Sequence, residues 1–103
     1  MKKALSFIEG HYREDLKLAD VAEHVCLSPN YLSQQLKQQT GKSFLEHLCG
    51  WRLEEAKRLL GSSLLPVGQV AERVGYDNPR YFSEVFQRHC GKTPSQFRKS
   101  CRP

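Results

Sequence analysis

The 103-residue sequence lacks any apolar run approaching the roughly 18 consecutive residues that a membrane-spanning helix needs. It also lacks a signal peptide, because Glu9, Gly10 and His11 interrupt the short apolar run that follows the first residues. These two absences argue against a membrane protein and against a secreted one. We therefore expect a cytoplasmic protein without a membrane partner.

Cysteine is scarce, and no Cys-x-x-Cys pair is present. The four cysteines are Cys26, Cys49, Cys90 and Cys101. They are too few for a disulfide scaffold, which predicts reduced thiols. Three of them have a histidine one or two positions away, but residues so spaced on a helix point in different directions and form no ready chelate. No nucleophile, base and orienting carboxylate assemble either, so we expect no metal, no cofactor and no enzyme; a thiol or metal-dependent activity is the weakest alternative.

What the sequence does contain is an excess of positive charge. Sixteen Lys and Arg against eleven Asp and Glu give a formal net charge of +5, within an otherwise ordinary globular composition. A basic balance favours a polyanionic partner such as nucleic acid. Many basic domains bind none, so the positions of the residues must decide.

The most informative feature is an internal repeat. Residues 21–25 (VAEHV) match residues 70–74 (VAERV), and the correspondence continues from 28–43 to 78–93. The offset is 49 residues before the turn and 50 after it, so the second copy has one extra residue, around Asp77. Two copies of one supersecondary unit explain this pattern better than chance does.

Each copy has the pattern of helix, short turn, helix. Apolar residues recur at helical spacing before the turn, at Leu18, Val21, Ala22 and Val25 and again at Val67, Val70, Ala71 and Val74. A capping residue followed by proline then begins a second helix, and a glycine ends it. These residues are Ser28, Pro29 and Gly41 in the first copy and Asn78, Pro79 and Gly91 in the second.

A capping box follows each copy and predicts a further helix. The boxes pair Ser43 with Glu46 and Thr93 with Gln96. The first of these helices runs to about Leu60, with an apolar stripe of Leu45, Leu48, Cys49, Leu53, Ala56, Leu59 and Leu60; Arg52 falls within it and is expected to be structural. The fold class is therefore all-α, with about seven helices, no convincing strand, and two helix-turn-helix subdomains (1–42 and 62–103) joined by a long connecting helix (43–61).

A helical wheel gives the second helix of each copy one core face and one outward face. The core faces hold Leu32, Gln35, Leu36 and Gln39, and Phe82, Val85, Phe86 and His89. The outward faces hold Asn30, Ser33, Gln34 and Lys37, and Arg80, Ser83, Glu84 and Gln87. Such polar side chains can hydrogen-bond to base edges in the major groove. A merely solvated face would also be polar, but twofold repetition behind the same capped turn favours base readout.

Groups that flank these faces are the expected phosphate contacts. They are Tyr31, Lys42 and Ser43 in the first copy and Tyr81, Arg88, Lys92 and Thr93 in the second, with Arg98, Lys99 and Arg102 further along. Helix starts and basic side chains are the usual phosphate-binding groups.

Several runs jointly resemble the AraC/XylS DNA-binding domain. They are LADVA (18–22), LSPNYLS (27–33), TGKSF (40–44), the spacing RL, A, LL over 52–60, VGY (74–76), YF (81–82), GKTP (91–94) and FR (97–98). The resemblance covers nearly the whole chain. It implies a bacterial transcription regulator with two recognition helices in successive major-groove segments of double-stranded DNA, often an activator that contacts RNA polymerase. Full-length members usually carry a separate sensing or dimerisation domain, which this chain lacks.

The sequence also departs from that family. Gln34 and Glu84 stand where the family often has Arg or Lys, which leaves the base preference open. Cys26 occupies the turn position that holds Gly75 in the second copy, where a left-handed backbone costs a non-glycine residue about 1 kcal/mol or more. The modest charge of the outward faces supports one alternative, a helical protein-interaction adaptor that does not bind DNA.

Overall fold

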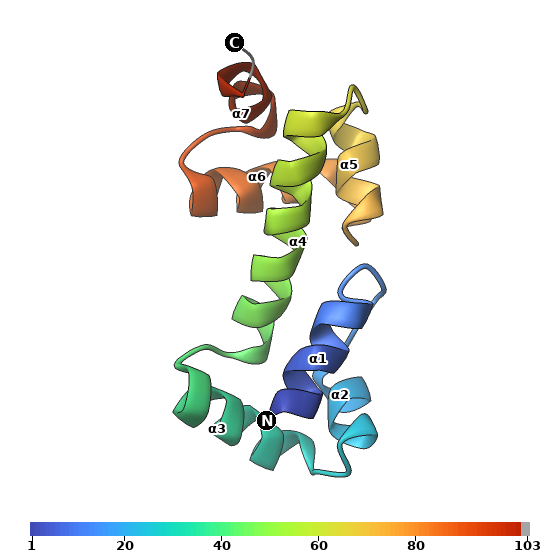
Figure 1. Ribbon diagram of the computed structural model, residues 1–103, viewed down its shortest axis with the longest axis vertical. Coiled ribbons are helices and arrows are strands. Elements are labelled where there is room, and N and C mark those ends of the chain that lie inside the picture. The colour runs from blue at the N-terminus through green and yellow to red at the C-terminus, as the bar shows by residue number, and fades with distance from the viewer. Residues whose placement is uncertain (102–103) are drawn as a thin grey trace. The chain divides into compact units, whose positions relative to one another are not determined.

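The computed structural model describes residues 1–101, which form seven α-helices with short connections (Figure 1). The helices are α1 (Lys2–His11), α2 (Leu18–His24), α3 (Pro29–Thr40), α4 (Phe44–Ser62), α5 (Val67–Arg73), α6 (Pro79–Cys90) and α7 (Pro94–Ser100). No strand occurs in this range, so the predicted all-α class is confirmed. No helix within the same residues is both long and apolar enough to cross a membrane.

The chain divides into two compact units, Met1–Trp51 and Arg52–Pro103, and the boundary falls inside α4. The first unit holds α1, α2, α3 and the start of α4. The second holds the rest of α4 with α5, α6 and α7. Each unit therefore contains one of the two predicted helix-turn-helix motifs, α2–α3 or α5–α6, together with part of the same long helix.

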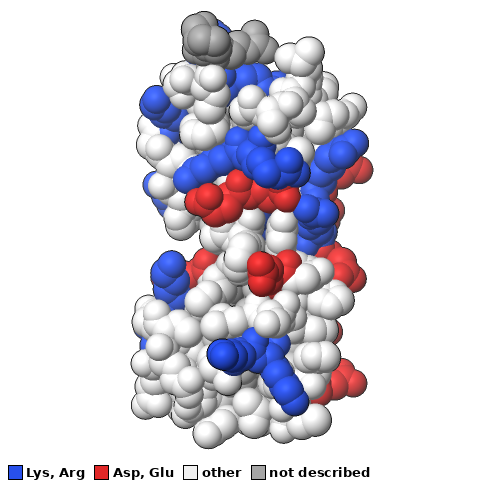
Figure 2. Space-filling model, in the orientation of Figure 1, with Lys and Arg blue, Asp and Glu red and all other residues white. Residues whose placement is uncertain are grey.

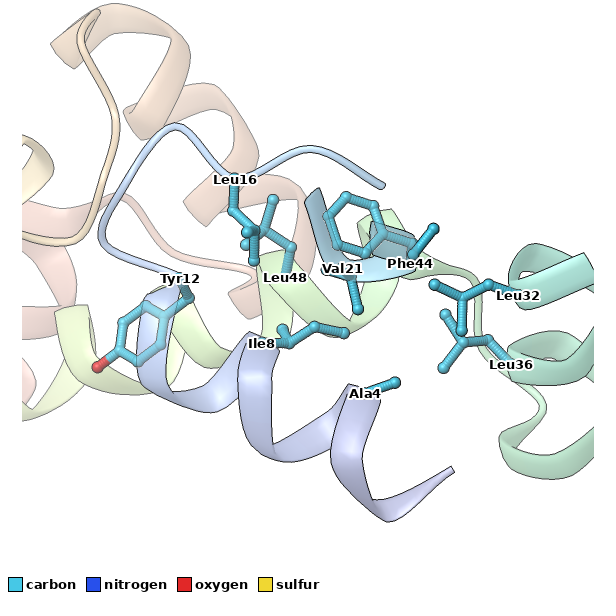
Figure 3. Close-up of a cluster of buried hydrophobic side chains, with 10 residues drawn as sticks. Ala4, Ile8, Tyr12, Leu16, Val21, Leu32, Leu36, Phe44 and Leu48 are labelled. Atoms are coloured by element: carbon cyan, nitrogen blue, oxygen red, sulfur yellow. The ribbon is translucent and has the colours of Figure 1, made fainter. Parts of the chain in front are cut away.

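The first unit encloses a cluster of apolar side chains that come from all of its helices (Figure 3). Its fully buried members include Ile8 of α1, Val21 of α2, and Leu32 and Leu36 of α3. Phe44 completes the cluster from the start of α4. This packing fixes one face of α3 against the core and leaves the opposite face outward.

The second unit has a core with more aromatic residues. Phe82 and Phe86 of α6 and Val70 of α5 are fully buried. The ring centroids of Phe82 and Phe86 lie 5.8 Å apart, and Phe97 of α7 meets Phe86 edge-to-face at 5.6 Å. Such aromatic pairs add to the stabilisation from burial alone. These aromatic pairs hold α6 in the second unit through the face that corresponds to the buried face of α3 in the first unit.

The turns of the two helix-turn-helix motifs differ in length from each other, as the offset of the repeat predicts. Residues 25–28 join α2 to α3, whereas residues 74–78 join α5 to α6, so the second turn has the one extra residue. Cys26 has φ +59° and Gly75 has φ +106°. Cys26 is the one non-glycine residue with positive φ in the described part of the chain, which confirms the predicted left-handed conformation at this position.

The starts and ends of α3 and α6 follow the predicted signals. The Ser28 hydroxyl accepts the Tyr31 backbone N–H at 3.2 Å. The Asn78 side-chain oxygen accepts two backbone N–H groups, those of Arg80 at 2.9 Å and Tyr81 at 3.2 Å. Each helix then ends at a left-handed glycine, Gly41 with φ +76° and Gly91 with φ +77°.

Both predicted capping boxes are present. Glu46 accepts the Ser43 backbone N–H and Ser43 accepts that of Glu46, each at 3.2 Å. Thr93 and Gln96 make the same reciprocal pair, at 3.0 and 3.2 Å. Helix α4 therefore begins directly after Ser43 and runs to Ser62, two residues beyond the predicted end.

Three residues assigned to core faces are exposed instead. Leu45 is 70% exposed, because Phe44 and Leu48, one helical turn apart, form the buried side at the start of α4 and Leu45 lies one position round the helix. Gln39 and His89 are exposed near the ends of α3 and α6. A helical wheel predicts one core face along the whole length of a helix. The last turns of α3 and α6, which carry Gln39 and His89, instead extend beyond the part of each helix that packs on its core.

Candidate nucleic-acid interface

The outward face of α3 carries all four predicted base-reading side chains in exposed positions. These are Asn30, Ser33, Gln34 and Lys37. Their exposure follows from the burial of Leu32 and Leu36 on the opposite side of the same helix. The face offers amide, hydroxyl and ammonium groups, which supply both donors and acceptors to base edges.

The outward face of α6 is similar but carries a different set of charges. Arg80, Glu84 and Gln87 are exposed, and Ser83 is half-buried. Arginine can bind guanine through two hydrogen bonds, and a carboxylate can accept from cytosine. The two helices therefore present different sets of polar and charged groups.

The predicted phosphate-binding groups lie at the edges of these faces. Lys42, Arg88 and Lys92 are exposed, and the side chains of Tyr31 and Tyr81 are about half exposed. Ser43 and Thr93 are half-buried because their hydroxyl oxygens cap α4 and α7. Each hydroxyl still has a proton that can be donated to an anion.

Arg52 has the structural role predicted for it. Its guanidinium carbon lies 5.0 Å from the centre of the Tyr76 ring, in the geometry of a cation–π contact. Tyr76, which is buried, in turn meets the ring of Tyr81 at 5.9 Å between centroids. Arg52 thus supports the turn that leads into α6.

The guanidinium of Arg98, one of the expected phosphate contacts, makes hydrogen bonds within the protein. It donates to the backbone carbonyl oxygens of Leu60, at 3.1 Å, and Leu65, and the residue is half-buried. Leu60 lies in the last turn of α4, where helix geometry leaves carbonyl acceptors unpaired, and Leu65 lies in the segment between α4 and α5. Arg98 therefore closes the end of α4 and is a poor candidate for phosphate binding. Lys99 is exposed, and Arg102 lies outside the described residues.

Two polar contacts at the link between α3 and α4 were not expected from the sequence. The Nζ atom of Lys37 lies 3.6 Å from Oε1 of Glu46, and Nε2 of His47 lies 2.8 Å from the Thr40 hydroxyl oxygen. That hydroxyl donates to a carbonyl one turn back and accepts the Lys42 backbone N–H at 3.2 Å. The left-handed Gly41 brings these groups together, and helical periodicity has no signal for a contact across such a turn.

The ionisation of the link follows from these contacts. The hydrogen bond from the Ser43 backbone, followed by the charge of Lys37, lowers the pKa of Glu46 from its usual value. Burial, followed by the charge of Lys42, lowers the pKa of His47. At neutral pH Glu46 is therefore a carboxylate and His47 an uncharged imidazole.

Charge alone does not outline a binding surface. On the face shown in Figure 2, Lys and Arg side chains lie beside Asp and Glu side chains in both units. Within residues 1–101 no group of three His, Cys, Asp or Glu side chains is placed to hold a metal ion, and the four cysteines are free thiols. The candidate interface therefore rests on the exposed faces of α3 and α6.

Comparison with known proteins identifies the repeated motif. Residues 21–100 match the family model described as a helix-turn-helix domain. The arabinose operon regulatory protein of Escherichia coli (strain K12) is 39% identical over 102 residues, which cover 98% of this chain and 35% of that protein. The chain thus spans about a third of the length of this relative.

Solved structures share the fold over nearly the whole chain. The C-terminal domain of AraT, a response regulator from Geobacillus stearothermophilus, superposes with a TM-score of 0.93 at 43% identity, covering 96% of this chain and 83% of that one. The DNA-binding domain of AdpA, a global transcriptional factor solved in complex with a target DNA, superposes with a TM-score of 0.90 at 25% identity, covering 96% and 89%. The chain therefore belongs to the AraC-type helix-turn-helix family, and it is a sequence-specific DNA-binding domain of a transcription regulator rather than an enzyme.

Proposed function

We propose that α3 and α6 are two recognition helices that enter adjacent major-groove segments of one DNA duplex. The observation that carries this proposal is the repeated construction of the two helices. Each is capped at a proline start, buried through one apolar face, ended at a left-handed glycine and exposed on a polar face. Selection for burial or solubility alone does not require the same arrangement twice.

Within these helices we assign base readout to the outward side chains. In α3 they are Asn30, Ser33, Gln34 and Lys37, and in α6 they are Arg80, Ser83, Glu84 and Gln87. Asn and Gln suit adenine, Arg suits guanine, and Glu suits cytosine. Glu84 would repel nearby phosphates, so its presence favours a role at a base edge over a role at the backbone.

Phosphate contacts are assigned to residues at the helix ends. They are Tyr31, Lys42, Ser43, Tyr81, Arg88, Lys92 and Thr93. Contacts of this kind position a protein on the duplex and carry no base preference of their own. The corresponding functional division is a first helix-turn-helix subdomain (1–42), a connecting helix (43–61) and a second subdomain (62–103).

The domain is proposed to work as part of a larger regulator. The relative named above is nearly three times as long as the stretch that matches, so it has room for a sensing or dimerisation domain. We propose that the complete protein acts in the bacterial cytoplasm, contacts RNA polymerase and activates transcription. The adaptor alternative has no comparable support, since the family is one of DNA-binding regulators.

Single substitutions on the two kinds of position test the assignment. Gln34→Ala should lose about 1–3 kcal/mol of discrimination at one base pair, because a hydrogen-bonded base edge is lost. Lys42→Ala should weaken binding to all duplexes alike and reduce the salt dependence of log K by about 1, because one phosphate contact is lost. If both variants weakened every duplex equally, the base-reading face would be assigned wrongly.

A further inference from the structure

The two copies of the repeat differ at a pair of positions on either side of the turn after each recognition helix. The 50-residue offset aligns Lys37 with Gln87 and Glu46 with Gln96. The first copy therefore has two opposite charges where the second has two neutral amides. Both members of the pair differ together, which suggests that the two side chains act on each other.

The geometry of the first copy supports this interpretation. Oε1 of Glu46 accepts the backbone N–H of Ser43 at 3.2 Å, and the same oxygen lies 3.6 Å from Nζ of Lys37. One carboxylate oxygen thus caps α4 and at the same time pairs with a side chain on the outward face of α3.

The second copy separates these two roles. Its Gln96 completes the capping box with Thr93 through an uncharged amide, with hydrogen bonds of 3.0 and 3.2 Å. The cap therefore requires an oxygen acceptor at this position and does not require a charge. The charge of Glu46 remains to be explained, and the basic group it pairs with is Lys37.

We propose that Glu46 is a positioning residue for DNA readout, whose carboxylate restrains the Lys37 ammonium and limits its contacts with phosphates of any sequence. This inference rests on the proposed role of the outward face of α3. A lysine has a long, flexible side chain that can reach many acceptors, so an unrestrained Lys37 would add affinity without adding discrimination. Restraint by Glu46 directs it to one place on the duplex.

The pair has the strength that such a role needs. The side chains of Lys37 and Glu46 are 63% and 51% exposed, so water screens their attraction. Lys37 is restrained by Glu46 but can still exchange the carboxylate for an acceptor on DNA. A tightly buried ion pair would instead keep the ammonium from the duplex altogether.

The variant Glu46→Gln isolates the charge, since it installs the residue that the second copy already uses as a cap. We expect its affinity for mixed-sequence duplex to rise about threefold, with a smaller gain on a preferred duplex, so that the specificity ratio falls. The dependence of log K on log salt should steepen by up to about 1, because the released lysine neutralises a phosphate. Thermal unfolding should change only slightly, because the amide keeps the cap and an exposed ion pair contributes little stability.

Two further variants complete the test by fluorescence anisotropy over a salt series. In the Lys37→Gln background, Glu46→Gln should have little effect, which gives a non-zero coupling in the double-mutant cycle. Glu9 is an exposed carboxylate on α1, so the control variant Glu9→Gln measures the effect of losing one negative charge away from this pair. Equal effects of the substitutions at Glu46 and Glu9, or additive effects in the cycle, would overturn the inference while leaving the proposed function intact. If the unmodified domain showed no sequence preference, the proposed function would fail and the inference with it.

Discussion

Replacing Cys26 with glycine should stabilise the first unit, because Cys26 is the one described residue whose Cβ is held in a left-handed conformation, at φ +59°. That conformation costs an ordinary L residue about 1–2 kcal/mol. Glycine removes this cost, but it has more conformational freedom in the unfolded chain, which lowers the free energy of unfolding by about 0.5–1 kcal/mol. The Cys26 side chain is exposed, so its removal sacrifices little burial. The net expected gain is about 0.5–1 kcal/mol.

The unique tryptophan gives a direct assay for this unit. Trp51 is the one Trp in the sequence, belongs to the unit Met1–Trp51 and stacks on Tyr12 at 6.3 Å between ring centroids. Urea unfolding followed by its fluorescence, under reducing conditions, should show a higher midpoint for Cys26→Gly than for the parent chain.

Cys26→Ala serves as the matched control, since it removes the thiol and keeps the Cβ. It should show no gain. In the second unit, Gly75→Ala places a Cβ at the equivalent position, where φ is +106°, and should destabilise the domain. If Cys26→Gly were no more stable than Cys26→Ala, the claim that the left-handed backbone at Cys26 lowers the stability of the first unit would be wrong.

Three other features of the structure give measurable expectations. Asn78→Ala should cost about 1 kcal/mol of stability, because two N–H groups at the start of α6 lose their acceptor; an unchanged urea midpoint would contradict the cap. Arg98→Ala should lower the free energy of unfolding by about 1–3 kcal/mol, measured by thermal unfolding, because the carbonyls of Leu60 and Leu65 lose their donor. The same variant should leave the salt dependence of DNA binding unchanged, and a shallower salt dependence would show that Arg98 contacts a phosphate. The pKa of His47 is lower in the folded chain than its usual value of 6.5, so the unfolded chain binds a proton more readily than the folded chain does. The free energy of unfolding is therefore highest above pH 6.5 and decreases as the pH falls through the folded-state pKa of His47. His47→Gln should flatten this decrease in pH-dependent unfolding, and identical pH profiles for the variant and the parent chain would contradict the argument.

Local signals in the sequence predict most of the fold. The caps at Ser28 and Asn78, the glycines that end α3 and α6, and both capping boxes each depend on residues within a few positions of one another. The repeat adds a check, because each signal occurs twice at one offset. The left-handed Cys26 is predictable for the same reason, since its partner in the second copy is a glycine.

Features that depend on how helices meet are harder to predict. Leu45 belongs to an apolar stripe by spacing, yet it is 70% exposed, because Phe44 and Leu48 form the buried side at the start of α4. The hydrogen bonds of Arg98 join residues 38 and 33 positions apart, so no short-range pattern indicates them. The same holds for Lys37 and Glu46, which the left-handed turn at Gly41 brings together.

The central claim is that α3 and α6 each read a separate segment of one duplex. Selection of bound duplexes from a random pool, repeated with Gln34→Ala and with Arg80→Ala, tests it most directly. We predict two short motifs whose centres lie roughly 10 base pairs apart, with each substitution relaxing only one of them. A single motif, or two substitutions that relax the same base pairs, would contradict the account.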